Sequence, residues 1–151
     1  MPVLKKASAE TLALRITVVD PPPNILWALQ LGQDEVVKPT LSTKNRIIFD
    51  FRVEVVEDSS SSAGFRLRGP AVQGRRGERF VYLRMGAYAG QAGAPAGWRA
   101  KIGLEGISHE LVRAVKAKRS GVLEVELAGT GPKGGPACAT VPLLGAGWHV
   151  K

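Results

Sequence analysis

The sequence has few of the residues that mark several large classes of protein. A single cysteine in 151 residues excludes an intramolecular disulfide framework and any Cys-rich zinc site. No apolar run approaches the roughly 20 residues that a membrane-spanning helix needs. The first ten residues also lack the apolar core of a secretory signal. We therefore expect a cytoplasmic protein with no membrane partner.

Residue patterns that carry catalysis or bind cofactors are also missing. The two histidines, His109 and His149, are forty residues apart, and neither has a ligand-spaced carboxylate or a second histidine beside it. There is no Gly-x-Ser-x-Gly nucleophile motif and no P-loop. Cys138 lies among small apolar residues, which is typical of a packed strand thiol. The sequence predicts no metal and no cofactor, and it favours a protein that is not an enzyme.

Negative charge is scarce in the second part of the chain. The net charge of the whole chain is +8, but residues 1–60 carry seven basic and eight acidic side chains, whereas residues 61–151 carry fourteen and five. Between Arg66 and Arg84 there are six arginines and a single acid, Glu78. Arginine forks pair bidentately with carboxylate and phosphate groups. This excess predicts either a surface that faces anions or a solvated sheet face.

Apolar residues alternate with polar ones along most of the chain, which is the pattern of β-strands. The clearest case runs from Arg46 to Val56, where a row of apolar residues faces one way and charged residues face the other. The run from Phe80 to Met85 is apolar on both faces apart from Arg84, which predicts a central strand covered on both sides.

One segment has the features of a helix, at about residues 109–119. Ser108 is a suitable N-cap, Glu110 lies near the positive N-terminus, and Lys116 lies near the negative C-terminus. Gly121 suits the C′ position that ends such a helix.

Together these patterns predict a mainly β protein, an antiparallel barrel or sandwich of about seven to eight strands with the helix capping one end. A content of 44% hydrophobic and 23% charged residues is ordinary for a folded protein. Length and the lack of a composition break predict a single domain over residues 1–151, with residues 1–10 flexible. Trp148 is expected to dock back onto this domain.

The segment from Arg68 to Tyr82 is the candidate ligand site. It contains a glycine-bounded hairpin whose backbone N–H groups and arginines would suit a small ligand that bears a phosphate or carboxylate group. The candidate binding residues are Arg68, Gln73, Arg75, Arg76, Arg79 and Tyr82.

Three functions remain open for this chain. The first is a non-catalytic module that binds a small anion at the hairpin, and the second is a nucleic-acid-binding protein that uses the same basic face. Nucleic acid is less favoured, because aromatic residues make up only 6% and no stripe interleaves them with arginine. The third is an enzyme with a pocket at a barrel mouth, where Tyr82 or the pair Glu124 and Glu126 would act as acid or base. Alternatively, the hairpin is plain, and its arginines pair with Glu78, Glu124 and Glu126.

Part of this segment resembles a small bacterial family catalogued as a domain of unknown function. The matching residues are Arg68-Gly69-Pro70-Ala71-Val72-Gln73-Gly74, then Gly77-Glu78-Arg79-Phe80-Val81-Tyr82-Leu83, followed by the strand with Arg99-Ala100-Lys101. The resemblance covers most of the chain and implies a bacterial cytoplasmic protein without an assigned activity.

Overall fold

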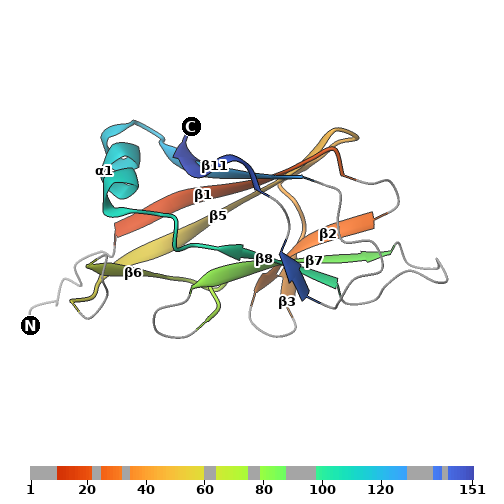
Figure 1. The fold of residues 1–151 in the computed structure, drawn as a ribbon, viewed down its shortest axis with the longest axis horizontal. Helices are drawn as coiled ribbons and strands as arrows, with labels where there is room; N and C mark the ends of the chain where they lie inside the picture. The colour runs from red at the N-terminus through yellow and green to blue at the C-terminus, as the bar shows by residue number, and fades with distance from the viewer. Residues whose placement is uncertain are drawn as a thin grey trace, which may run out of the picture.

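Two β-sheets stacked in two layers form a sandwich with one helix at its end (Figure 1). The structure is a computed structural model that describes residues 10–21, 25–31, 35–59, 64–74, 79–87, 98–128, 138–140 and 143–151. Sheet A contains β1 (Glu10–Val19), β4 (Leu41–Ser42), β5 (Arg46–Glu57), β6 (Phe65–Arg68), β9 (Val122–Ala128) and β11 (Leu143–Val150). Its order is β11-β9-β1-β5-β4, and β6 also pairs with β5. Sheet B has the order β10-β8-β7-β2-β3, with β2 (Ile25–Leu31), β3 (Glu35–Val37), β7 (Phe80–Ala87), β8 (Trp98–Gly103) and β10 (Cys138–Thr140).

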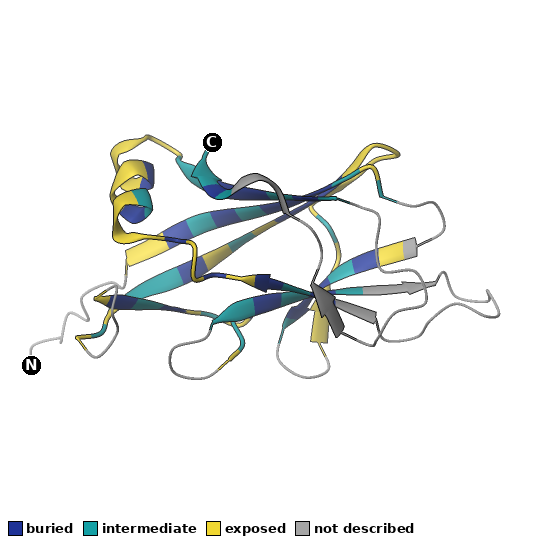
Figure 2. Ribbon diagram, viewed as in Figure 1, coloured by how far each residue is buried: buried dark blue, intermediate teal, exposed yellow. Residues whose placement is uncertain are grey.

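The core lies between the two sheets and is built by the alternation that the sequence predicts. On β1, Leu14 and Ile16 are fully buried and pair with Phe51 and Phe49 of β5. Val81 and Leu83 of β7 supply buried residues from sheet B. Figure 2 shows buried residues interrupted by more exposed ones along the long strands of sheet A. The period-two pattern therefore places one apolar face of each sheet against the other.

The predicted fold class is confirmed, and of its two alternatives the structure is the sandwich and not a closed barrel. Two details of the prediction are wrong. The described residues form eleven strands, because β3, β4 and β10 are only two or three residues long and show no periodicity. The sheets are also mixed, since β9 runs parallel to β1 and β10 runs parallel to β8.

The helix α1 (His109–Ala117) begins where the sequence predicts and ends two residues earlier than expected. The Ser108 hydroxyl accepts a hydrogen bond from the Leu111 N–H at 3.2 Å, as an N-cap does. The helix lies at one end of the layers, beside sheet A (Figure 1), and buries Val112 and Val115. The C-cap is Lys118, so Gly121 is not the C′ residue. Gly121 is required by space, because an added Cβ would lie 2.4 Å from the Val115 carbonyl oxygen.

The strand β7 is central in sheet B, as predicted, but it is not covered on both sides. Val81 and Leu83 are buried, whereas Phe80, Tyr82 and Arg84 on the other face are half-buried. These three side chains on the outer face of sheet B are therefore partly exposed.

The predicted docking of Trp148 is confirmed, since its ring is buried and its Nε1–H donates to the Gly103 carbonyl at 2.9 Å. Glu10 is the first residue of β1. Several expectations lie outside the described residues: those on residues 1–9, on Arg75, Arg76 and Glu78, and on the side chain of Cys138.

Candidate anion-binding site

The two arms of the predicted hairpin are joined by backbone hydrogen bonds where the hairpin begins and ends. Gln73 and Phe80 exchange two backbone hydrogen bonds, at 2.7 and 3.1 Å. The Arg79 guanidinium donates to the Gly74 carbonyl at 2.8 Å, which ties its charge to the start of the loop. Arg75 and Arg76 are outside the described residues.

The remaining predicted residues belong to two different sheets. Gln73 pairs with Phe80, so its side chain shares the outer face of sheet B with Tyr82. Arg68 is on β6 of sheet A, where its Nε donates to the Glu54 carboxylate at 2.6 Å. The structure therefore brings Gln73, Arg79 and Tyr82 to one hairpin and strand, and it places Arg68 on another surface.

We call the outer side of the β7–β8 pair the β7–β8 face, and it consists of Gln73, Phe80, Tyr82, Arg84 and Lys101. Phe80 and Tyr82 make an edge-to-face pair with ring centroids 4.9 Å apart, and the Lys101 ammonium lies 4.3 Å from the Phe80 centroid. The strands β2, β7, β8 and β10 contain no Asp or Glu. This face therefore combines aromatic rings with cations on acid-free strands.

A second basic surface lies on sheet A, where two neighbouring cavities share Thr11 and Arg52 as lining residues. One cavity has a volume of about 400 Å³ and lies between β1, β5 and the turn from α1 to β9. The other has a volume of about 590 Å³ and extends over β5 to Arg68 and Pro70. We call this surface the basic groove, and its polar lining is Thr11, Arg52, Arg68, Lys116, Lys118 and Ser120, with Glu54 as its one acidic lining residue among those described.

The cations of the basic groove differ in the groups with which they pair. Lys116 pairs with Glu10, and Arg68 pairs with Glu54. Lys118 donates to the main-chain oxygen of the terminal residue Lys151 at 3.0 Å, and Arg52 donates to the Thr11 hydroxyl at 2.8 Å. The Thr11 hydroxyl is a neutral partner, so this contact does not cancel the positive charge of Arg52.

Sequence reasoning missed Arg52, Lys116 and Lys118 as possible anion ligands. Arg52 lies in the acidic half of the chain and alternates with Asp50 and Glu54, which is the pattern of a solvated strand face. Lys116 and Lys118 lie at the helix C-terminus, where lysines are common because they stabilise the negative end of the helix dipole. Only the packing of α1 beside β1 and β9 brings them to one groove with Arg52.

The carboxylates considered for catalysis, Glu124 and Glu126, line neither of these cavities. Glu124 is buried and accepts a hydrogen bond from the Thr17 hydroxyl at 2.9 Å. Burial raises the pKa of Glu124, but the Thr17 hydrogen bond and the Lys151 charge outweigh it and leave the pKa below its ordinary value. Contrary to the plain-hairpin alternative, Glu124 makes its ion pair among the described residues with Lys151, and the His149 ring lies 3.4 Å from its other carboxylate oxygen.

Comparison with known proteins identifies a family but no activity. The model of the family of unknown function DUF5990 matches residues 12–151, so the chain belongs to that family, as its resemblance to a domain of unknown function suggested. No curated protein and no solved structure matches the chain significantly. No helix among the described residues is long and apolar enough to cross a membrane.

Proposed function

We propose that this member of the DUF5990 family is a non-catalytic module that binds a small phosphate- or carboxylate-bearing ligand in the basic groove. The observation that carries the proposal is the convergence of Arg52, Arg68, Lys116 and Lys118 on two adjoining cavities whose only acidic lining residue among those described is Glu54. Small-ligand sites are concave and place a few polar groups around an otherwise apolar lining.

The chemistry of the groove suits an anion better than a cation or a neutral ligand. Arg52 offers a planar fork that matches two oxygen atoms of phosphate or carboxylate, and its contact with Thr11 keeps that fork in the groove. Lys118 adds a point charge from the end of α1, and Ser120 adds a hydroxyl that donates or accepts.

The helix alone explains part of this charge. Lys116 and Lys118 lie at the C-terminus of α1, where cations stabilise a helix without any ligand. Arg52 has no such explanation, because it lies on β5 of the neighbouring sheet and contacts a neutral hydroxyl. Arg52 is therefore the residue on which the proposal depends most.

The test is thermal unfolding with sodium phosphate as the probe, at an ionic strength kept constant with sodium chloride. Phosphate at ten times its Kd would stabilise the fold by about 1.4 kcal/mol. For a chain of this size, that corresponds to a rise in Tm of about 3–6 °C. Arg52→Ala and Lys118→Ala are expected to remove most of the rise.

Arg46→Ala and Lys44→Ala are the matched controls, because they make the same charge changes on exposed residues outside the groove. Both are expected to keep the full rise. No phosphate-dependent rise in the wild-type protein, or an equal loss in the control variants, would overturn the proposal. The hairpin hypothesis gives a different result, because there the double variant Arg75→Ala with Arg76→Ala abolishes the rise and Arg52→Ala does not.

A second candidate function, nucleic-acid binding, is favoured by the β7–β8 face. Single-stranded nucleic acid binds exposed sheet faces on which aromatic rings stack with bases and cations contact phosphates. Phe80, Tyr82, Arg84 and Lys101 provide both kinds of group on neighbouring strands. Binding of a fluorescent oligonucleotide should then fall steeply between roughly 50 and 200 mM salt. It should be lost in Tyr82→Ala or Arg84→Ala but kept in Arg52→Ala, and the absence of binding by the wild-type protein would reject this function.

A further inference from the structure

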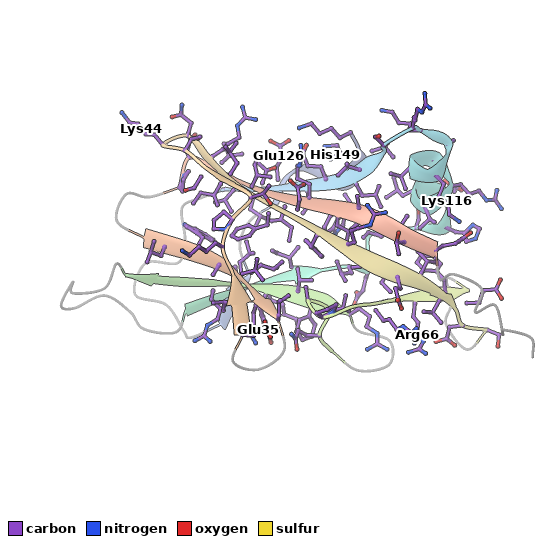
Figure 3. The ribbon with its side chains drawn as sticks, turned by 180° about the vertical axis from the view of Figure 1, so that it is seen from behind. Glu35, Lys44, Arg66, Lys116, Glu126 and His149 are labelled. Carbon is purple, nitrogen blue, oxygen red and sulfur yellow. The ribbon has the colours of Figure 1, made fainter. Side chains whose placement is uncertain are left out.

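A cluster of potential metal ligands lies on sheet A outside the basic groove. The carboxylates of Glu124 and Glu126 and the ring of His149 each offer one ligand atom, and these atoms all lie within 4.8 Å of one another. Figure 3 shows Glu126 and His149 close together on the side of the molecule formed by sheet A. None of the three lines the basic groove.

The fold explains why these residues meet although His149 is far from the glutamates in sequence. Glu124 and Glu126 are two residues apart on β9 and thus point to the same face of the sheet. The strand β11 pairs with β9, but its register shifts between Leu144 and His149. Gly147, at φ 91°, lies within this irregular stretch, which brings His149 opposite Glu124.

The hydrogen bond of the His149 ring fixes which nitrogen faces the glutamates. Nδ1 lies 3.0 Å from the Gly147 carbonyl oxygen, which can only accept, so Nδ1 carries the hydrogen. Nε2 lies 3.4 Å from Oε1 of Glu124. Nε2 therefore points at a carboxylate oxygen across a distance at which one cation, a proton or a metal ion, can bind to both atoms. A backbone carbonyl that holds the second ring N–H is the usual support of a metal-binding histidine.

The carboxylate of Glu124 is held in place by its other oxygen. Oε2 accepts from the Thr17 hydroxyl at 2.9 Å and lies 3.5 Å from the Lys151 ammonium, while the side chain is only 9% exposed. This leaves Oε1 directed toward His149. Among the described residues, no hydrogen bond or ion pair engages the Glu126 carboxylate, which lies half-buried beside the pair.

We propose that Glu124, Glu126 and His149 form a binding site for a divalent first-row transition-metal ion such as Zn²⁺. Two ligand atoms about 2.1 Å from a tetrahedral ion are about 3.4 Å apart, which matches the separation of Nε2 of His149 and Oε1 of Glu124. Glu126 completes the set by a small side-chain rotation, and one coordination position remains for water. A mixed set of one imidazole and two carboxylates suits Zn²⁺ or Mn²⁺ better than Mg²⁺ or Ca²⁺, which take oxygen ligands.

The alternative is that the positive charge at this cluster comes only from a proton on His149 and from the Lys151 ammonium group. A protonated His149 and Lys151 would then balance the two glutamates as an ion-pair network. The two arrangements differ in the role of Lys151, which stabilises the network but opposes a metal ion by repulsion. Lys151→Met therefore tightens metal binding in one case and creates none in the other.

The experiment is a calorimetric titration of the full chain, without a polyhistidine tag, with ZnCl₂. One Zn²⁺ per chain is expected for the wild-type protein. His149→Ala and Glu126→Gln should each weaken binding by more than about 100-fold, because loss of a supporting contact alone costs about 10–100-fold. Thr17→Val removes such a contact and should fall within that smaller range.

The matched controls are His109→Ala and Cys138→Ser, which remove the other histidine and the cysteine. Both should bind Zn²⁺ as the wild-type protein does. Absence of stoichiometric binding by the wild-type protein, or unchanged affinity in His149→Ala, would overturn the proposal. If His149→Ala does not fold, as judged by circular dichroism, Glu126→Gln decides alone, because this near-isosteric change affects a residue that is not fully buried.

Discussion

The turn between α1 and β9 predicts how much stability is lost when Gly121 is replaced by alanine. Replacing Gly121 by alanine adds one methyl group, which would lie 2.4 Å from the Val115 carbonyl oxygen and 2.8 Å from its Cγ2. Ordinary contacts are about 1 Å longer, and Val115 is itself buried in the core, so it has no room to retreat. Overpacking of this kind costs about 1–3 kcal/mol.

Part of this cost is offset in the unfolded state. Alanine restricts the unfolded chain more than glycine does, which stabilises the fold by about 0.4–1 kcal/mol where the backbone accepts it. The net loss for Gly121→Ala is then up to about 2.6 kcal/mol, or a fall in Tm of up to about 10 °C. Gly103→Ala is the matched control, because its added Cβ would meet nothing within 4 Å.

Chemical denaturation with urea measures both variants against the wild-type protein. Gly121→Ala is expected to lower the midpoint, and Gly103→Ala is expected to leave it unchanged or raise it slightly. A Gly121→Ala protein as stable as the Gly103→Ala protein would refute the steric argument and with it the close packing of the turn against Val115.

Two further predictions concern the core and the surface of sheet A. Leu14→Ala, at a fully buried position between the sheets, should reduce the free energy of unfolding by about 2.7–5 kcal/mol in a urea titration, and a loss below about 1 kcal/mol would contradict the described core. Arg68→Ala should change the Tm by no more than about 4 °C, because its ion pair with Glu54 is exposed and such pairs contribute at most about 1 kcal/mol. A larger change in scanning calorimetry would show that Arg68 has a structural role that the described contacts do not include.

The parts of the fold that depend on local pattern were predictable from the sequence. The alternation from Arg46 to Val56 predicts β5, and Ser108 with Glu110 predicts the start of α1. The parallel pairing of β1 with β9 was not predictable, because no local signal records which strand a distant segment joins. Very short strands were missed for a similar reason, since two or three residues show no period.

The charge pattern shows why the candidate site could be predicted only in part. The contrast between an acidic first part and a basic second part of the chain does not persist in space. Arg66 lies 3.7 Å from Asp58, Arg68 pairs with Glu54, and Lys116 pairs with Glu10, so acids of the first part neutralise cations of the second. Ion pairs formed in the folded chain thus determine which cations have an acidic partner. Arg52 donates to a neutral hydroxyl instead, although its neighbours in the sequence include several acids.

The same reasoning explains why the metal-ligand cluster has no sequence signature. His149 reaches Glu124 across the β9–β11 pairing, and the register shift near Gly147 sets the contact. Ligand spacing along the chain detects sites within one element or one turn, whereas this cluster is formed by two strands that pair only after folding.

The central claim is that the basic groove binds small anions, and an amide NMR titration with sodium phosphate at constant ionic strength tests it most directly. The account predicts saturable shifts at Thr11, Arg52, Lys118 and Ser120, with one common Kd and no such shifts in the Arg52→Ala protein. Shifts that are confined to the Gln73–Tyr82 segment, or that rise linearly without saturation over the whole surface, would contradict it.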